Sequence, residues 1–211
     1  VLTMARYLTI HPDDPQQRLL VQAADVVRQG GVVAIPTDSC YALGCHLGDK
    51  DAVERIRRIR DVDERHHLTL MCRDLSEIAQ FARVDNAQYR LLKATTPGSY
   101  TFILEGTKEL PRRVLHPKRK TIGLRVPAHK VALALLAALG EPLLTSTLAL
   151  PGDCAPLTEG WEIQDRLDDH LELILDGGHC GTEPTTVIDL TRLPLELIRA
   201  GRGPLAPFGL E

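Results

Sequence analysis

Four side chains that can form hydrogen bonds directly follow a short apolar segment near residue 35. The apolar segment, Val32 to Ile35, predicts a strand, and the turn after it carries Thr37, Asp38, Ser39 and Tyr41. Loops that follow strands in α/β proteins often bind ligands, because the sheet holds them in place while their sequences vary. The alternative is an ordinary turn in which the aspartate caps its own backbone.

Basic residues are concentrated in two further segments. The first contains Arg55, Arg57, Arg58, Arg60 and Arg65, and the second contains Lys108, Arg112, Arg113, Lys118, Arg119 and Lys120. Residues 1–130 carry 21 lysines and arginines against 15 acidic residues, whereas residues 131–211 carry 4 against 13. This segregation favours a surface for the phosphates of a nucleotide or a nucleic acid. The alternative is a solvated helix face and an exposed loop.

Other kinds of site find little support in the sequence. The five cysteines are scattered without a CxxC pair, which argues against a disulfide framework and against a zinc site. Cys45 and His46 are adjacent rather than spaced as metal ligands, and we predict no metal site. No apolar run reaches the roughly 18 residues of a membrane span, so we expect a cytoplasmic protein that does not contact a membrane. Val1 to Thr3, ahead of Met4, are expected to be additions to the natural start.

Hydrophobic periodicity predicts alternating helices and strands. Helices are expected at Pro15–Gln29, Lys50–Arg60, Leu75–Ala82, Asn86–Lys93, Lys130–Leu139 and Glu162–Asp169. Strands are expected at Val32–Ile35, Leu68–Cys72, Tyr100–Glu105, Thr121–Val126, Leu143–Leu148, Leu171–Asp176, Thr186–Leu190 and Leu195–Ala200. This order predicts an α/β fold with a twisted, open, mixed sheet and flanking helices.

The whole chain, residues 1–211, is expected to form one domain. A chain of 211 residues with 44% hydrophobic and 25% charged residues has the size and composition of a single globular unit. No repeat and no linker rich in Pro, Gly or Ser divides it. The longest predicted loop, Gly106 to Lys120, joins two strands that we expect to pair.

Six motifs, in order along the chain, resemble those of the YrdC/YciO-like family, whose best-known members are threonylcarbamoyl-AMP synthases. Residues 36–44 (PTDSCYALG) resemble the family signature PTDTxYGL, and 58–60 (RIR) stand where the family has KxR. Residues 97–104 (PGSYTFIL) are similar to PGPxTxxL, and 125–127 (RVP) to RxP. Residues 184–189 (PTTVID) resemble PSTVxD, and 198–201 (IRAG) the closing xRxG. Together these motifs span nearly the whole chain.

The resemblance implies a fold with a wide, concave and basic face, and it implies a reaction. Threonine and bicarbonate form an N-carboxylate that attacks the α-phosphate of ATP, and the product donates its threonylcarbamoyl group to an adenosine of tRNA. Such chemistry requires positioning and charge neutralisation more than a nucleophile, so no catalytic residue is assigned. ATP with Mg²⁺ is then a substrate complex, and no tightly bound cofactor is expected.

Site residues are carried over by motif. The resemblance implies that phosphates are bound by Arg58, Arg60, Thr147 and Arg199. It implies that threonine is bound by Thr37, Arg125 and Thr185. For RNA, either tRNA or double-stranded RNA, the basic segments suggest Arg55, Arg57, Arg112, Arg113, Lys118, Arg119 and Lys120.

One departure from the family pattern bears on the use of ATP. Residues 145–152 (TSTLALPG) stand where the synthases have STSANLSG, so Thr147 and Ala149 replace a serine and an asparagine that contact phosphate. Loss of one such amide costs roughly 1–3 kcal/mol. The pattern is more similar to the YciO branch, and three functions stay open. They are a threonylcarbamoyl-AMP synthase, a non-catalytic RNA-binding protein, and a diverged hydrolase of threonylcarbamoylated tRNA.

Overall fold

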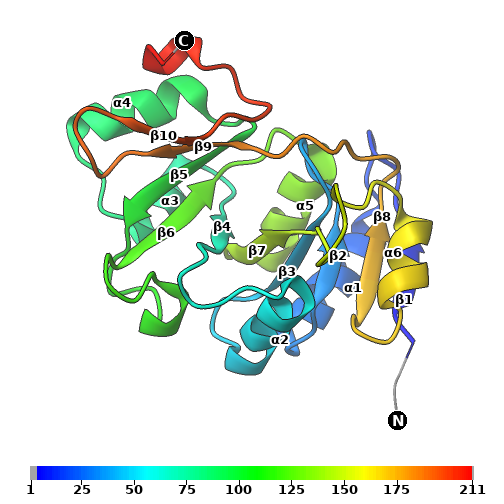
Figure 1. Ribbon diagram of the computed structural model, residues 1–211. Helices are drawn as coiled ribbons and strands as arrows, with labels where there is room; N and C mark the ends of the chain where they lie inside the picture. Colours follow the sequence, from blue (N-terminus) through cyan, green and yellow to red (C-terminus); the bar gives the residue numbers. More distant parts are fainter. Residues whose placement is uncertain (1–3, 211) are drawn as a thin grey trace.

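The computed structural model describes residues 4–210, which include one mixed sheet of ten strands (Figure 1). The strands are β1 (Arg6–Thr9), β2 (Val33–Ile35), β3 (Ala42–His46), β4 (Thr69–Met71), β5 (Tyr100–Glu105), β6 (Thr121–Arg125), β7 (Leu143–Thr147), β8 (Leu173–Asp176), β9 (Thr186–Asp189) and β10 (Glu196–Arg199). Their order in the sheet is β1-β8-β2-β3-β7-β4-β6-β5-β9-β10. The predicted α/β class with a mixed sheet is confirmed.

Parallel and antiparallel neighbours alternate irregularly across the sheet. The pairs β1–β8, β2–β8, β4–β6 and β5–β9 are parallel, and the remaining neighbours are antiparallel. The pairing of β5 with β6 across the 106–120 loop confirms the prediction for that loop. The expectation about Val1 to Thr3 concerns residues outside the described range.

Helices lie on both faces of the sheet (Figure 1). They are α1 (Gln17–Arg28), α2 (Lys50–Arg60), α3 (Leu75–Phe81), α4 (Asn86–Thr95), α5 (Lys130–Leu139) and α6 (Gly160–Leu167), with short 3₁₀ turns η1 (Arg112–Val114) and η2 (Ala206–Phe208). The apolar stripes of α1 and α5 form one core with residues of β2 and β8. Residues of α2, α3 and α6 contribute to a second, larger core. No helix within residues 4–210 has the length and apolar character needed to cross a bilayer.

Helix α2 packs against the interior strand β3 and carries several basic residues. Its first turn is capped by Asp49, whose carboxylate accepts from the backbone N–H of Ala52 at 3.0 Å. It ends at Asp61, whose φ of 53° places a non-glycine residue in the left-handed region. The face that carries Ile56 also carries Arg57, which is 7% exposed. The helix therefore directs its arginines in different directions.

Two strands were not predicted. β1 is a short, half-exposed strand at one edge of the sheet, where a hydrophobic pattern is weak. β3 reads ALGCH, and its alanine and glycine have low β propensity. It forms because β2 and β7 pair with it on both sides, which is a tertiary effect that the local sequence does not encode.

Candidate functional site

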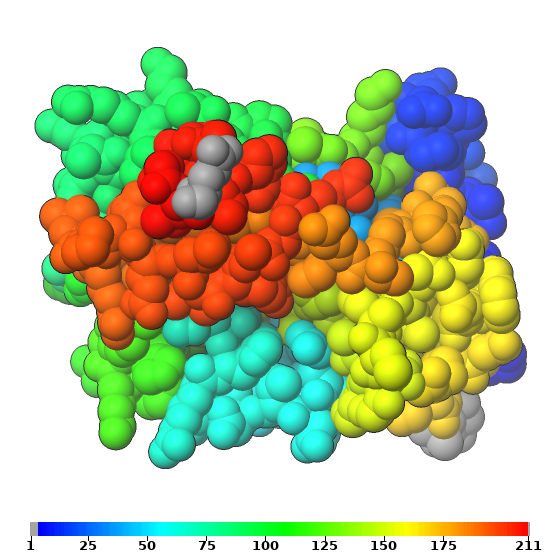
Figure 2. All heavy atoms as spheres, turned by 45° about the horizontal axis from the view of Figure 1, so that its top comes forward, coloured from blue at the N-terminus to red at the C-terminus, as the bar shows by residue number. Residues whose placement is uncertain are grey.

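A cavity of about 930 Å³ lies over the strands in the middle of the sheet. Successive side chains of a strand point to opposite faces, so Thr69 and Met71 of β4 share one face, as do Thr101 and Ile103 of β5, and all four line the cavity. Nine serines and threonines line it: Thr37, Ser39, Thr69, Thr101, Thr145, Ser146, Thr147, Thr182 and Thr185. Figure 2 shows a hollow between the cyan segment after α2, the yellow segment before α6 and the orange strand β10.

One end of the cavity is built from the turn after β2 and from the last residue of β6. The carboxylate of Asp38 forms an ion pair with Arg125, and it also accepts from the backbone N–H of Ala128 at 3.0 Å and from the Ser99 hydroxyl at 3.1 Å. Burial raises the pKa of Asp38, but Arg125 and these donors outweigh burial and hold it below its ordinary value. The pair therefore stays ionised although both side chains are almost buried.

Arg125 retains an unused donor at this end. One of its nitrogens reaches the Ser39 hydroxyl at 3.3 Å, but its Nε is buried and has no hydrogen-bond partner among residues 4–210. The Thr37 hydroxyl donates to the carbonyl of Cys40 at 2.6 Å and accepts from the N–H of Ser39 at 3.1 Å. The structure thus brings the predicted threonine-binding residues Thr37 and Arg125 together, with Thr37 fixing the turn and Ser39 lying between them.

The predicted threonine-binding residue Thr185 lies on the segment leading into β9. Its hydroxyl is 2.7 Å from that of Thr101, and its carbonyl accepts from Nε and Nη2 of Arg199 at 3.1 and 2.9 Å. Thr185 therefore lies beside the predicted phosphate-binding Arg199 and orients its guanidinium. Its partner Thr101 lies on β5, which pairs with β6, the strand that ends at Arg125.

Two arginines from distant segments face this part of the cavity. Arg60, at the end of α2, donates from Nε to the carbonyl of Ala149 at 3.0 Å and from Nη1 to the Ser146 hydroxyl at 2.7 Å. Burial, and then the positive charge of Arg199, lower the pKa of Arg60, and burial lowers the pKa of Arg199 as well. Neither forms an ion pair with a carboxylate in the described part of the chain. Two partly buried cations without a counter-ion favour an anion between them.

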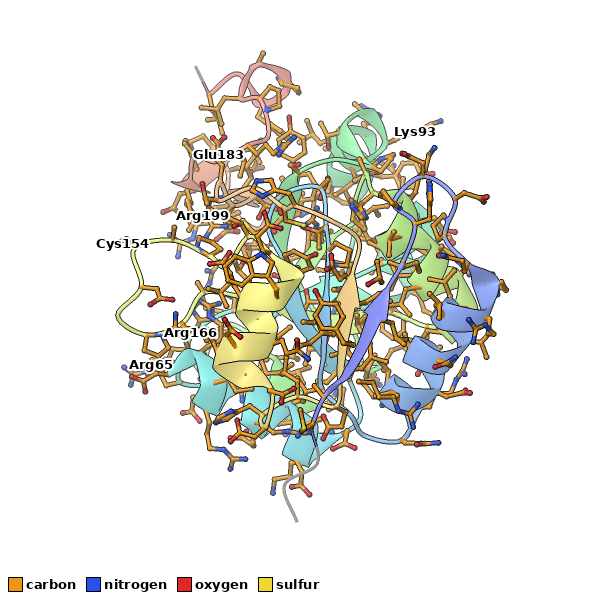
Figure 3. The ribbon with its side chains drawn as sticks, turned by 90° about the vertical axis from the view of Figure 1, so that its right-hand side faces the viewer. Arg65, Lys93, Cys154, Arg166, Glu183 and Arg199 are labelled. Atoms are coloured by element: carbon orange, nitrogen blue, oxygen red, sulfur yellow. The ribbon has the colours of Figure 1, made fainter. Side chains whose placement is uncertain are left out.

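The other two predicted phosphate ligands are placed differently. Thr147 is half-buried and lines the cavity, whereas Arg58 is exposed and does not line it. Figure 3 shows Arg199, Cys154 and Arg65 on one side of the molecule, with Arg166 on α6 below Cys154. Of the predicted phosphate-binding arginines, Arg60 and Arg199 line the cavity and Arg58 does not.

Several predicted RNA-binding residues are engaged within the protein. Arg55 pairs with Glu172 at 2.6 Å, and Arg119 pairs with the fully buried Asp189 at 2.5 Å. Arg57 is buried, so its placement on an RNA-binding surface is corrected here. Its guanidinium reaches Glu54 and the carbonyl of Arg113, both at 3.3 Å, because position 57 falls on the inner face of α2.

The rest of the second basic segment has more freedom. Arg113 donates to the carbonyl of Gly48 at 2.7 Å, and Lys120 to that of Pro117 at 2.7 Å. Arg112 and Lys118 are exposed, and no side-chain hydrogen bond or ion pair ties them within residues 4–210. The segment is a compact turn, because the His116 ring accepts from the N–H of Arg119 at 3.2 Å.

Two adjacent histidines in the cavity wall were missed as site residues. The His67 ring bonds the Thr121 hydroxyl at 2.8 Å and stacks on His116 with ring centres 5.3 Å apart. Burial and the neighbouring His116 lower the pKa of His67 to about 4. His66 also lines the cavity, and burial together with Arg60 and Arg199 lowers its pKa. Their adjacency after a basic helix was the available sequence signal.

Cys40 is the buried thiol that reaches the cavity. Burial raises its pKa in spite of three nearby arginines, so it is a neutral thiol and is not activated as a nucleophile. Within residues 4–210, no group of three or more His, Cys, Asp or Glu side chains is placed to hold a metal ion. Charge neutralisation and hydrogen bonding are the chemistry that the cavity offers.

The fold and this cavity define an α/β protein with a cavity lined by arginines and hydroxyl groups over the face of a mixed sheet. The model of the Sua5/YciO/YrdC family, described as telomere recombination, matches residues 25–201. The chain therefore belongs to the Sua5/YciO/YrdC family.

Relatives of two kinds match over most of the chain. The uncharacterized protein YciO of Escherichia coli is 55% identical, with 97% of this chain and 100% of that protein covered. The threonylcarbamoyl-AMP synthase of Halorhodospira halophila is 34% identical over 79% of this chain and 87% of that protein. The crystal structure of E. coli YciO matches with a TM-score of 0.94 over the same 97% and 100%. Pyrococcus abyssi Sua5 complexed with L-threonine matches with a TM-score of 0.87, at 27% identity over 95% of this chain and 58% of that one.

Proposed function

We propose that this protein acts in tRNA threonylcarbamoyladenosine metabolism and that its cavity binds threonine and the phosphate of an adenylate. The observation that carries the proposal is the pair Arg60 and Arg199, which face one cavity without a counter-ion among residues 4–210. The cavity is also lined by the guanidinium of Arg125 and the Ser39 hydroxyl, which suit a carboxylate. A threonylcarbamoyl-adenylate has both groups, a phosphate for Arg60 and Arg199 and a carboxylate for Arg125.

The proposed reaction is synthesis of that adenylate from L-threonine, bicarbonate and ATP with Mg²⁺. The carbamate oxygen formed from the threonine amine and bicarbonate attacks the α-phosphorus, the bond to the β-phosphate oxygen breaks, and pyrophosphate leaves. Arg60 and Arg199 would neutralise charge on the phosphoryl oxygens, and Ser146 and Thr147 would donate or accept hydrogen bonds nearby. These residues would position the reacting groups and neutralise the charge of the phosphate, which is what phosphoryl transfer requires.

The phosphate end of the cavity has a limited number of donors. Each arginine already directs two of its three guanidinium nitrogens to protein oxygens, which leaves Nη2 of Arg60 and Nη1 of Arg199 without a protein acceptor within residues 4–210. Ala149 lines the cavity and offers no side-chain donor. Two free guanidinium nitrogens suit one phosphate group, so we expect the adenylate to bind better than ATP and the synthesis to be slow.

RNA is proposed as the macromolecular partner. The observation that favours it is a group of exposed cations near α2 and the 106–120 loop that make no ion pair within residues 4–210, among them Arg58, Arg65, Arg112 and Lys118. Affinity for RNA without catalysis is the second candidate function. RNA binding of this kind would depend on the exposed cations and would not depend on Arg60 or Arg199.

The test is mass spectrometry of the products formed from ATP, Mg²⁺, threonine and bicarbonate. We expect threonylcarbamoyl-AMP and pyrophosphate with the wild type and neither with Arg60→Ala or Arg199→Ala. Arg192→Ala is the matched control, because Arg192 is exposed and pairs with Glu196 at 2.9 Å. A wild type that forms no product, and whose thermal stability does not respond to threonine or AMP, would overturn the proposal.

A further inference from the structure

We infer that His66 is a third ligand of the anion held between Arg60 and Arg199, and that its imidazole takes up a proton when the anion binds. The inference rests on the proposed function in one respect, namely that a tetrahedral oxyanion lies between the two arginines. It adds a residue outside the family motifs described above, and it adds a dependence of binding on pH.

The position of His66 is fixed by the segment between α2 and β4. The N–H of Val62 donates to the carbonyl of Arg57 at 3.0 Å, which continues from the end of the helix. The Asp63 carboxylate accepts from the N–H of Arg65 at 2.9 Å, and the Asp63 carbonyl accepts from the N–H of His66 at 3.2 Å. This turn holds the His66 ring at the wall of the cavity, near its opening.

The two adjacent histidines differ in what their rings contact. The ring of His67 is engaged by Thr121 and His116, so it supports the wall. His66 is exposed and lines the same cavity, and its ring makes no hydrogen bond with any group in residues 4–210. An imidazole with free nitrogens beside two uncompensated guanidinium groups is a site for an oxyanion.

Charges from each neighbouring element act on this ring. Arg60 and Arg57 of α2 and Arg199 of β10 disfavour its protonation, and Asp63 of its own segment favours it. Burial and these positive charges together outweigh Asp63 and lower the pKa of the ring. A bound dianion compensates those charges and accepts a hydrogen bond from the protonated ring, which raises the affinity of the ring for a proton.

The direction of the pH effect follows by linkage. If the bound state binds one more proton than the free state, affinity must rise as the pH falls through the pKa of the bound form. One proton permits at most about a tenfold change per pH unit. Since histidine ordinarily titrates near 6.5, we expect sulfate to bind several-fold more tightly at about pH 6 than at about pH 8.

The test uses sulfate, which stays a dianion over this range, whereas a phosphate monoester titrates near pH 6 itself. Calorimetry at about pH 7 in two buffers with different protonation enthalpies counts the protons taken up on binding. We expect uptake with the wild type, and no uptake and no pH dependence with His66→Gln, which retains a donor but does not titrate. His170→Gln is the control, because His170 is exposed and pairs with Asp169 at 2.6 Å.

A second measurement needs no variant. The C2 proton of His66, followed by NMR, should titrate at a higher pH with sulfate present than without it. An unchanged titration midpoint, or sulfate binding by the wild type without proton uptake, overturns the role of His66 and leaves the Arg60 and Arg199 site intact. Failure of both sulfate and AMP to bind at either pH overturns the inference and the phosphate site of the proposed function together.

Discussion

The Asp38 carboxylate and the Arg125 guanidinium form an ion pair that joins the turn after β2 to the end of β6. The strands β2 and β6 are separated in the sheet by β3, β7 and β4. The pair therefore spans the sheet at one end of the cavity, and the side chains that hold it are 10% and 6% exposed.

Asp38→Ala should destabilise the protein strongly. It leaves the Arg125 charge buried without its partner, for which a cost of about 3–5 kcal/mol in unfolding free energy is typical. Because the pKa of Asp38 is lowered in the folded state, its contribution is present above about pH 4 and is lost as the pH falls through the folded value. Urea unfolding across this range should show a smaller loss of stability with acid for the variant. Equal acid dependence of both proteins would contradict the argument.

Ala149→Asn should improve ATP affinity. The side chain at 149 lines the cavity beside Arg60, and an asparagine amide there can donate to a phosphate oxygen, for roughly 1–3 kcal/mol. Calorimetry with ATP and with AMP measures the effect. The matched control is Ala155→Asn, which also lies on the cavity wall. Unchanged nucleotide binding would remove support for a weakened synthase and favour the RNA-binding candidate.

Neutralising four exposed cations that form no ion pair within residues 4–210 should weaken tRNA binding and reduce its dependence on salt. The variant replaces Arg58, Arg65, Arg112 and Lys118 by glutamine. Each RNA phosphate that is no longer neutralised should flatten the log-log salt slope by roughly 0.7–0.9, so the slope should change by about three units. Duplex RNA of unrelated sequence should weaken equally, because phosphate contacts carry no sequence information.

A control of equal charge is available for that experiment. The control replaces four arginines that pair with carboxylates: Arg28, Arg83, Arg166 and Arg192. It removes the same formal charge from positions already compensated, so its salt slope should stay close to that of the wild type. The RNA surface is falsified if the test variant and the control bind tRNA alike.

Gly201→Ala should disturb both stability and the phosphate site. A Cβ at this position would lie 2.3 Å from the carbonyl oxygen of Pro184 and 2.5 Å from that of Thr185, which Arg199 uses as its acceptor. Overpacking of this kind typically costs about 1–3 kcal/mol. We expect a lower melting temperature and weaker AMP binding. Normal stability with weakened AMP binding would still support the site. A variant with normal stability and normal AMP binding would contradict the argument that a side chain at position 201 is too crowded.

Long, periodic elements were predictable and contacts between distant segments were not. The period of α2 gives Val53, Ile56 and Ile59 as buried, and the same period extends to Arg57, which follows Val53 by four residues; the buried arginine was therefore detectable in principle. The strand at Ala42–His46 was not, since its burial depends on its neighbours. The order of the motifs predicted that Arg60, Arg125 and Arg199 share one site. The acceptors of Arg60 and Arg199, such as the Ser146 hydroxyl and the Thr185 carbonyl, could not be predicted from the local sequence.

The order of strands in the sheet has a consequence for synthesis of the chain. β2 pairs with β8, and β5 pairs with β9. Strands that are synthesised early therefore pair with strands that are synthesised near the C-terminal end of the chain. Until residues 173–189 leave the ribosome, β2 and β5 each present an open edge to other chains. Pairings so distant in sequence also slow folding, because the entropy of closing a long loop is lost before the strand contacts form. Assembly of the cavity is thus a late event, and the nascent chain depends on protection from aggregation until its last quarter is complete.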